Sequence, residues 1–296
     1  MTVFLVLAGF GGYWMNRRAL ASVDEITRTA RSIGAHDLSE RLKVSRTSDE
    51  LERLTNTLND MLARLESAFQ RITRFTANAS HELRTPVSVI RTSAEMSLRK
   101  PHSADKYQEA LSQILREAEK VSQLVEQLLV LARADAGSVA LPMIRTDVTK
   151  PLGSACQQAN LLAEAKQLTF RASVPKQPIW VQGDGSSLER LFLILLDNVV
   201  KYTPSGGRIQ VHLGSEDGLV VANIHDTGIG IAADDLPHVF DRFYRTDRAR
   251  SRESGGTGFG LAIGRWIAEA HKGEIHAESD PSKGSLFQVK LSLSAE

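Results

Sequence analysis

The chain of 296 residues contains a single cysteine, Cys156, and almost no excess of charge of either sign. One cysteine excludes an internal disulfide and a zinc site built from cysteines, and it is typical of a small buried side chain in a reducing compartment. The 36 basic and 35 acidic residues nearly cancel. Bulk charge therefore does not indicate a nucleic-acid partner, and none is expected. The length allows two or three modest domains.

The sequence also lacks a hydrophobic run long enough to cross a bilayer. Residues 2–15 are uncharged and mostly apolar, and Arg17 and Arg18 follow them. This run is short of the roughly 20 apolar residues that cross a bilayer, and it lacks the basic start and cleavage site of a secretory signal. We interpret residues 1–16 as the C-terminal part of a transmembrane helix, with the arginines on the inner side and a further helix and sensor upstream. A buried soluble helix is the alternative.

Apolar residues spaced alternately by three and four predict two long helices, separated by Lys100 and Pro101. The first helix is expected to open at Asp49, with Ser48 as its N-cap, after a turn-rich connector over residues 34–48. Heptad seams of this kind favour an antiparallel hairpin in a left-handed bundle. Because one hairpin cannot bury two such seams, we expect a homodimeric four-helix bundle, with a monomeric docked hairpin as the alternative. The seams are Leu51, Leu54, Leu58, Met61, Leu65, Ala68, Ile72, Phe75 and Ala79, then Leu111, Ile114, Ala118, Val121, Val125, Leu128 and Ala132.

The pattern changes after a linker over residues 134–142. Helical periodicity then alternates with short apolar runs that are typical of strands. This mixture predicts an α/β sandwich with helices on one face of a mixed sheet. The expected helices are residues 150–166 and 187–202, and the expected strands are residues 168–174, 179–181, 208–213, 219–225 and 286–293.

The first chemically suggestive segment surrounds His81. An imidazole can attack phosphorus when a neighbouring base holds its other proton, and Glu82 is adjacent. Thr85 lies one helical turn later on the same face, where its hydroxyl can orient a water. Pro86 removes an amide of the helix, so a bend is expected there. Alone, a helical histidine beside a glutamate is usually a solvated pair; its place in a bundle seam favours chemistry.

A second group of polar and glycine residues is spread over the C-terminal half. Asn198, with Lys201 and Tyr202 one turn later, offers an amide for Mg²⁺, a cation for phosphate and a ring to cover a base. Asp226 ends a strand, where its carboxylate can accept from the amino group of adenine. The glycine-rich segment 255–260 precedes a helix expected near Leu261, a suitable phosphate site that matches no dinucleotide-binding unit or P-loop.

In order and spacing these segments resemble the sensor histidine kinases of two-component systems. Residues 75–90 (FTANASHELRTPVSVI) resemble the phosphoacceptor box. Residues 195–207 (LLDNVVKYTPSGG) resemble the asparagine box, and DTGIG, FDRFYRTD and GGTGFGLAI resemble the other nucleotide boxes. Residues 284–287 (GSLF) are similar to the closing strand signature. Upstream, DLSERL and DEL resemble a HAMP signal-relay domain. The sequence of the HAMP and phosphoacceptor segments is similar to that of the heavy-metal-sensing subgroup.

The resemblance implies a domain order and a cellular location. It implies a HAMP linker over residues 17–69, a dimerisation and phosphotransfer domain over 70–135, and a catalytic ATP-binding domain of the Bergerat fold over 145–296. The protein would lie in the bacterial inner membrane with its catalytic part in the cytoplasm. A homodimer would pass phosphate from ATP, bound with Mg²⁺, to an aspartate of a response regulator.

The resemblance also implies residue roles. His81 would be phosphorylated, Glu82 would be the base and Thr85 would support phosphatase activity. Asn198 would hold Mg²⁺, and residues 232–257 would form a mobile lid over ATP. The remaining nucleotide contacts would be Lys201 and Arg245 at the phosphates, Asp226 at adenine, and Tyr202, Gly228, Gly230, Gly256, Thr257, Gly258, Phe259 and Gly260.

One position departs from the family pattern. The asparagine box usually has a second asparagine where this chain has Ile194. Two alternatives therefore remain open beside an active kinase: a degenerate kinase that acts mainly as a phosphatase, and a non-catalytic signalling scaffold. A metal-assisted ATPase of the wider superfamily is disfavoured, because it would give the His81 segment no task.

Overall fold

The structure is a computed structural model that describes residues 1, 9–10, 13, 28, 40–42, 49–101, 103–135, 141–244 and 258–294. It divides into two compact units, Met1–Asn78 and Ala79–Glu296. Most of the segment 1–16 lies outside the described residues, as do Arg245, Gly256 and Thr257. No helix in the described part of the chain is both long enough and apolar enough to cross a membrane.

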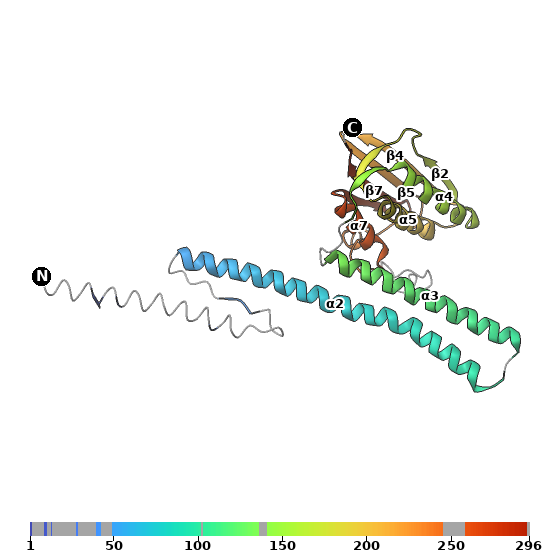
Figure 1. The fold of residues 1–296 in the computed structure, drawn as a ribbon, viewed down its shortest axis with the longest axis horizontal. Helices are drawn as coiled ribbons and strands as arrows, with labels where there is room; N and C mark the ends of the chain where they lie inside the picture. The colour runs from blue at the N-terminus through green and yellow to red at the C-terminus, as the bar shows by residue number, and fades with distance from the viewer. Residues whose placement is uncertain are drawn as a thin grey trace. The chain divides into compact units, whose positions relative to one another are not determined.

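The described elements follow one another in a helical part and then a mixed part (Figure 1). They are α2 (Asp49–Arg99), α3 (Ala104–Asp135), β1 (Ile144–Asp147), α4 (Thr149–Ala165), β2 (Thr169–Ser173), β3 (Trp180–Gly183), α5 (Gly185–Tyr202), β4 (Arg208–Glu216), β5 (Leu219–Asp226), η1 (Leu236–His238), α7 (Gly260–Ala270), β6 (Glu274–Asp280) and β7 (Gly284–Ser292).

In the first unit, a short piece of the predicted connector packs on α2. Leu42 is 3% exposed. Its backbone N–H donates to Oδ1 of Asn59 at 2.9 Å, and its carbonyl accepts from Nδ2 of the same side chain at 3.0 Å. Arg41 forms an ion pair with Glu66. The amide side chain of Asn59 thus satisfies both backbone groups of Leu42, which lies outside any helix or strand.

The two predicted long helices are present, and the break between them falls where the sequence placed it. α2 ends at Arg99 and α3 begins at Ala104. Pro86 lies inside α2 without ending it. In the second unit, the hydroxyl of Ser93 donates to Oε1 of Gln113 at 3.1 Å, which joins the two arms of the hairpin.

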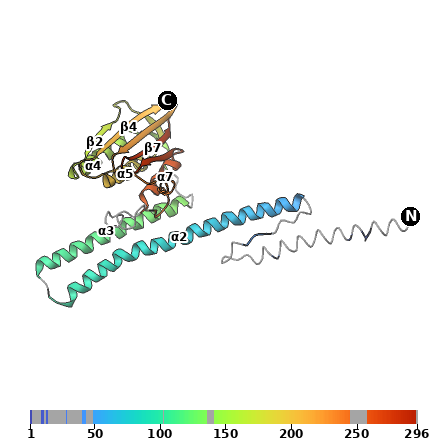
Figure 2. The ribbon, with the colours of Figure 1, turned by 180° about the vertical axis from the view of Figure 1, so that it is seen from behind.

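The predicted α/β sandwich is confirmed. A five-stranded mixed sheet has the order β2-β4-β5-β7-β6, with β2 and β4 parallel and the other pairs antiparallel. Alternate residues of β4, β5 and β7 are buried, because one face of the sheet is covered by α4, α5 and α7 (Figures 1 and 2). Cys156 is buried in α4, as expected, and burial raises its thiol pKa to about 11.

Helix α5 is the central helix of the sandwich. Its N-cap is Asp184, whose carboxylate accepts from the backbone N–H of Ser187 at 2.9 Å. Its buried face packs against both α4 and α7. The helix ends at Tyr202. Its last turn therefore lies at the edge of the core, where polar side chains can point away from the core. The buried residues of α5 are Leu188, Leu191, Phe192, Leu195, Leu196, Val199 and Val200.

Candidate active site

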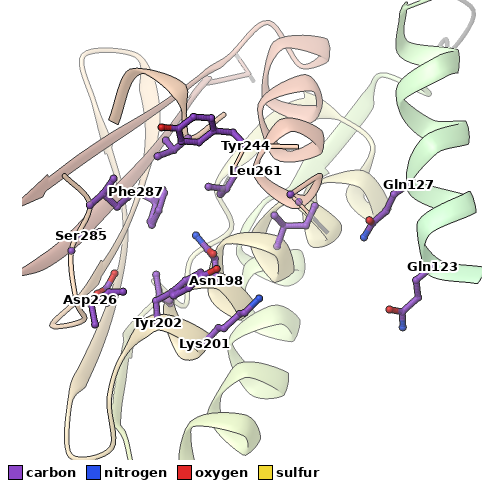
Figure 3. A pocket seen from close by; sticks show the side chains of 18 residues that line it. Gln123, Gln127, Asn198, Lys201, Tyr202, Asp226, Tyr244, Leu261, Ser285 and Phe287 are labelled. Atoms are coloured by element: carbon purple, nitrogen blue, oxygen red, sulfur yellow. The ribbon is translucent and has the colours of Figure 1, made fainter. Parts of the chain in front are cut away.

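A cavity of about 230 Å³ lies where α5, the end of β5, the start of β7 and the start of α7 meet (Figure 3). Residues from all four elements line it, together with the loop after β5 and two glutamines of α3. Among the predicted nucleotide contacts, those that line the cavity are Asn198, Lys201, Tyr202, Asp226, Gly230, Gly258 and Gly260.

Three of these side chains come from the last turns of α5. Asn198, Lys201 and Tyr202 are spaced by three and four residues, so a helix turns them to one side, and Figure 3 shows them together. The ammonium of Lys201 lies 5.2 Å from the centre of the Tyr202 ring, within the range of a cation–π contact. This end of α5 therefore offers an amide, a cation and an aromatic face to one ligand.

Asp226 is the buried carboxylate of the cavity. It is 3% exposed, and the backbone N–H of Gly228 donates to its Oδ1 at 2.6 Å. Burial raises the pKa of this carboxyl, while backbone N–H groups of Gly228 and Ser285 pull it back down. A carboxylate has more acceptor positions than these two N–H groups use, so Asp226 is suited to a ligand that brings its own N–H donor.

Two glycines of the cavity allow the backbone to approach closely. Gly230 has φ +70°, and a Cβ there would lie 2.2 Å from the carbonyl oxygen of Asp280. Gly258 has φ +72°, and a Cβ there would lie 2.9 Å from the backbone of Phe243. Both positions thus need glycine for conformation and for space.

The N-terminus of α7 borders the cavity. Gly260 begins the helix, and Gly258, Gly260 and Leu261 all line the cavity. Unsatisfied N–H groups at a helix start favour an anion. Phe259, predicted as a nucleotide contact, is fully buried, and its ring centre is 4.3 Å from that of Phe243. It does not line the cavity and instead anchors the start of α7; Gly228 does not line the cavity either.

Ile194, the departure from the asparagine box, has a clear packing role. It lines the cavity, and a Cβ on Gly260 or Gly264 would lie 3.4 or 3.7 Å from its Cγ2. The isoleucine therefore fills the space between α5 and the glycine face of α7. Its apolar contact joins two elements that border the same cavity.

The predicted phosphoacceptor residues lie on α2 and outside the cavity. His81 and Thr85 are exposed, and Glu82 is half-buried. The hydroxyl of Thr85 lies 3.5 Å from the carbonyl oxygen of His81, consistent with one turn on one side of the helix. His81 is therefore open to a reagent that comes from outside its own helix.

Several cavity residues were missed by sequence reasoning. Ser285 and Phe287 arrive from β7, and Tyr244 arrives from the loop after η1. The hydroxyl of Tyr244 donates to Asp235, and this hydrogen bond raises its pKa. Gln123 and Gln127 of α3 also face the cavity (Figure 3). The FDRFYRTD segment could have pointed to Tyr244, and the segment 284–287 could have pointed to Ser285 and Phe287. Gln123 and Gln127 occupy positions with no local signal.

Known families match the three parts of the chain. Residues 183–295 match the histidine kinase-, DNA gyrase B- and HSP90-like ATPase family, residues 71–137 match the His kinase A phosphoacceptor domain, and residues 14–67 match the HAMP domain. Sensor protein CutS of Streptomyces coelicolor is 37% identical over 287 residues, which are 97% of this chain and 68% of that protein. The chain belongs to the sensor histidine kinase family.

A second relative is a sensor histidine kinase, and a solved structure shares the fold. Sensor histidine kinase CusS of Escherichia coli K12 is 32% identical over 291 residues, 98% of this chain and 59% of that protein. The Acinetobacter baumannii histidine kinase AdeS has the same fold, with a TM-score of 0.57 and 23% identity over 73% of this chain and 98% of that one. This kinase thus combines a phosphoacceptor domain with an ATPase domain, and a non-catalytic scaffold is not favoured.

Proposed function

We propose that the kinase transfers the γ-phosphoryl group of ATP to His81 and then to an aspartate of a response regulator. The observation that supports this most is the convergence of Asn198, Lys201, Tyr202 and Asp226 on one cavity. Those four side chains offer partners for metal, phosphate, base face and base edge in a single site. The exposed His81 supplies the acceptor.

The residues of the cavity fit an ATP–Mg²⁺ complex. In the described part of the chain no cluster of three or more acidic, histidine or cysteine side chains could hold a metal alone. Mg²⁺ usually keeps waters and is shared between one or two protein oxygens and the phosphates of the substrate. Asn198 would supply the amide oxygen, and the metal would neutralise charge on the transferred group. Lys201 would contact a phosphate oxygen and Asp226 the amino group of adenine.

In the proposed reaction the γ-phosphoryl group of ATP is transferred to a ring nitrogen of His81. A ring nitrogen forms a bond to the γ-phosphorus as the bond to the β–γ bridging oxygen breaks and ADP leaves. The second ring nitrogen carries the proton, which Glu82 would hold or remove. The phosphoryl group then moves to a carboxylate oxygen of the response regulator, and the imidazole is restored. In the phosphatase reaction, Thr85 would orient a water toward the phosphorylated regulator.

The setting of this reaction is also a proposal. The apolar segment before Arg17 would anchor the protein in the inner membrane, and the HAMP segment would pass its signal to the dimeric helical domain. Similarity to CutS and CusS over nearly the entire chain supports membership of the heavy-metal-sensing subgroup.

Incorporation of label from γ-labelled ATP, with Mg²⁺, tests the proposal. The wild type should acquire acid-labile label, while His81→Ala and Asn198→Ala should acquire none. His212→Ala is a matched control, since His212 is an exposed histidine of β4 that does not line the cavity. It should retain wild-type labelling. Label that survives in His81→Ala would move the acceptor elsewhere, and no label in the wild type despite ATP binding would refute the kinase step.

A further inference from the structure

The end of α5 that carries Lys201 and Tyr202 is held by a side chain from another helix end. Lys166 follows the last residue of α4, and its ammonium donates to the carbonyl oxygens of Val200 at 2.9 Å and Lys201 at 2.7 Å. Lys166 is half-buried and does not line the cavity. It therefore contacts the backbone of the ligand-binding turn without facing the ligand.

The last four carbonyls of α5 each have a partner. In a helix these groups lack intrahelical donors. Val199 accepts from the backbone N–H of Thr203 at 3.0 Å, and Tyr202 accepts from that of Ile229 at 3.3 Å. Lys166 provides the donor for the two carbonyls between them. A cation at this place also complements the negative end of the helix dipole.

The residue after Lys166 extends the same contact to the segment that follows α5. Gln167 has φ +59°, and its carbonyl accepts from the backbone N–H of Gly206 at 3.0 Å. Its side-chain oxygen accepts from the hydroxyl of Ser205 at 3.0 Å. The backbone N–H of Thr169 donates to the carbonyl of Gly207 at 2.9 Å. The turn 166–169 thus forms hydrogen bonds both to the last turn of α5 and to residues 205–207, which follow the helix.

We propose that Lys166 is a positioning residue for nucleotide binding: it fixes the turn of α5 that presents Lys201 to phosphate and the Tyr202 ring to the base. This inference rests on the proposed function, because it assumes that the cavity binds ATP. The cation–π contact between Lys201 and Tyr202 depends on the backbone at both residues. A shift of that turn would move both groups together and leave Asp226, on β5, in place.

The α5 helix offers a matched control at its opposite end. His271 follows α7 and is 4% exposed. Its Nε2 accepts from the backbone N–H of Asp184 at 3.0 Å, and its Nδ1 donates to the carbonyl of Ile267 at 2.7 Å. Like Lys166, it links the end of a neighbouring helix to an end of α5. Neither His271 nor Asp184 lines the cavity, so loss of this link should affect stability alone.

The test is calorimetric titration of the full chain with ATP and Mg²⁺, and separately with adenosine. Lys166→Met should weaken ATP binding about tenfold, because it removes two charge-assisted hydrogen bonds from the ligand-binding turn. Lys166→Arg, which still brings a cation and several donors, should stay within about threefold of wild type. His271→Asn should lower the melting temperature but change ATP affinity less than about twofold. In labelling assays Lys166→Met should raise the KM for ATP and leave kcat within about threefold.

The outcomes separate the two proposals. Wild-type affinity in Lys166→Met would overturn the positioning role while leaving the ATP site intact. Equal weakening in Lys166→Met and His271→Asn would also overturn it, because general destabilisation would then explain both. If Lys166→Met does not fold, Lys166→Gln, which keeps a donor without the charge, takes its place, and wild-type ATP affinity in that variant would overturn the role. A wild type that binds no ATP would remove the proposed function, and this inference with it.

Discussion

The helical hairpin and the α/β sandwich use apolar residues in opposite ways. In α5 of the sandwich, Leu191, Phe192, Leu195 and Leu196 are each 0% exposed. In α3 of the hairpin, Leu111 of the predicted seam is 65% exposed. The sandwich therefore completes its core within one chain, whereas the seam of the hairpin needs a further surface. That contrast supports the dimerisation that the phosphoacceptor domain implies.

Exposed residues of the predicted seams occur in both units. In the first unit the α2 seam leaves Leu54, Met61 and Leu65 each 49% exposed. In the second unit Val125 of α3 is 41% exposed, while Leu124 and Leu131, outside the predicted seam, are nearly or fully buried. A single chain thus leaves part of each predicted seam exposed.

The largest expected effect is on assembly. Leu111→Glu with Val125→Glu should convert the dimer to a monomer, because two buried carboxylates would face two more across the interface. Sedimentation velocity or light scattering measures this directly. Leu161→Glu is the control, since Leu161 of α4 is 68% exposed in the sandwich and should not affect assembly. A dimer that persists in the double variant would place the interface elsewhere.

The second prediction concerns the core of the sandwich. Phe192→Ala should lower its free energy of unfolding by about 3–5 kcal/mol, because it leaves a cavity in a fully packed helix interface. Denaturant unfolding followed by circular dichroism measures the loss. Leu98→Ala, at an 86% exposed site of the hairpin, should change stability by less than about 0.5 kcal/mol. Similar losses in the two variants would contradict the contrast between the two regions.

The third prediction uses the buried carboxylate of the cavity. Burial raises the pKa of Asp226 above its ordinary value of 3.8, so the folded state binds this proton more tightly than the unfolded state. Its contribution to stability is therefore present below that value and is lost as pH rises through the folded pKa. Asp226→Asn should flatten this part of the pH profile of unfolding.

The same variant should weaken ATP binding by about tenfold or more, because a neutral amide is a weaker acceptor than a carboxylate and has only one acceptor atom, which Gly228 and adenine would have to share. Calorimetric titration measures this affinity, and His212→Ala provides the control for both experiments. An unchanged pH profile, together with unchanged affinity, would remove Asp226 from the site.

The smallest expected effect is at Ile194. Ile194→Asn should lower stability by about 1–2 kcal/mol, because it places an amide in the apolar contact between α5 and α7. Thermal unfolding measures this change, and Ile194→Val should lose less. Labelling rates of the two variants show whether the asparagine also improves catalysis. A stable Asn variant with faster labelling would mean that isoleucine is retained for a reason other than packing.

Long periodic elements were predictable, and short polar ones were not. The break at Lys100 and Pro101 and the apolar runs of β2, β3, β4, β5 and β7 all carry local patterns. The strands β1 and β6 were missed: the four residues of β1 include one apolar side chain, Ile144, and β6 is an edge strand in which Glu274, His276 and Glu278 are exposed. Edge strands need little apolar character, because one side of their backbone has no neighbour in the sheet.

The sequence by itself determined the domain types, the acceptor candidate His81 and the residues of α5 and β5 that converge on the cavity, because periodicity, glycine spacing and motif order are local properties. Only the tertiary structure decided that Phe259 supports the site from the core, that Ile194 fills the groove beside α7, and that Lys166 and His271 hold opposite ends of α5. Each of these depends on contacts between segments far apart in the chain, where packing and backbone hydrogen bonding select the partner.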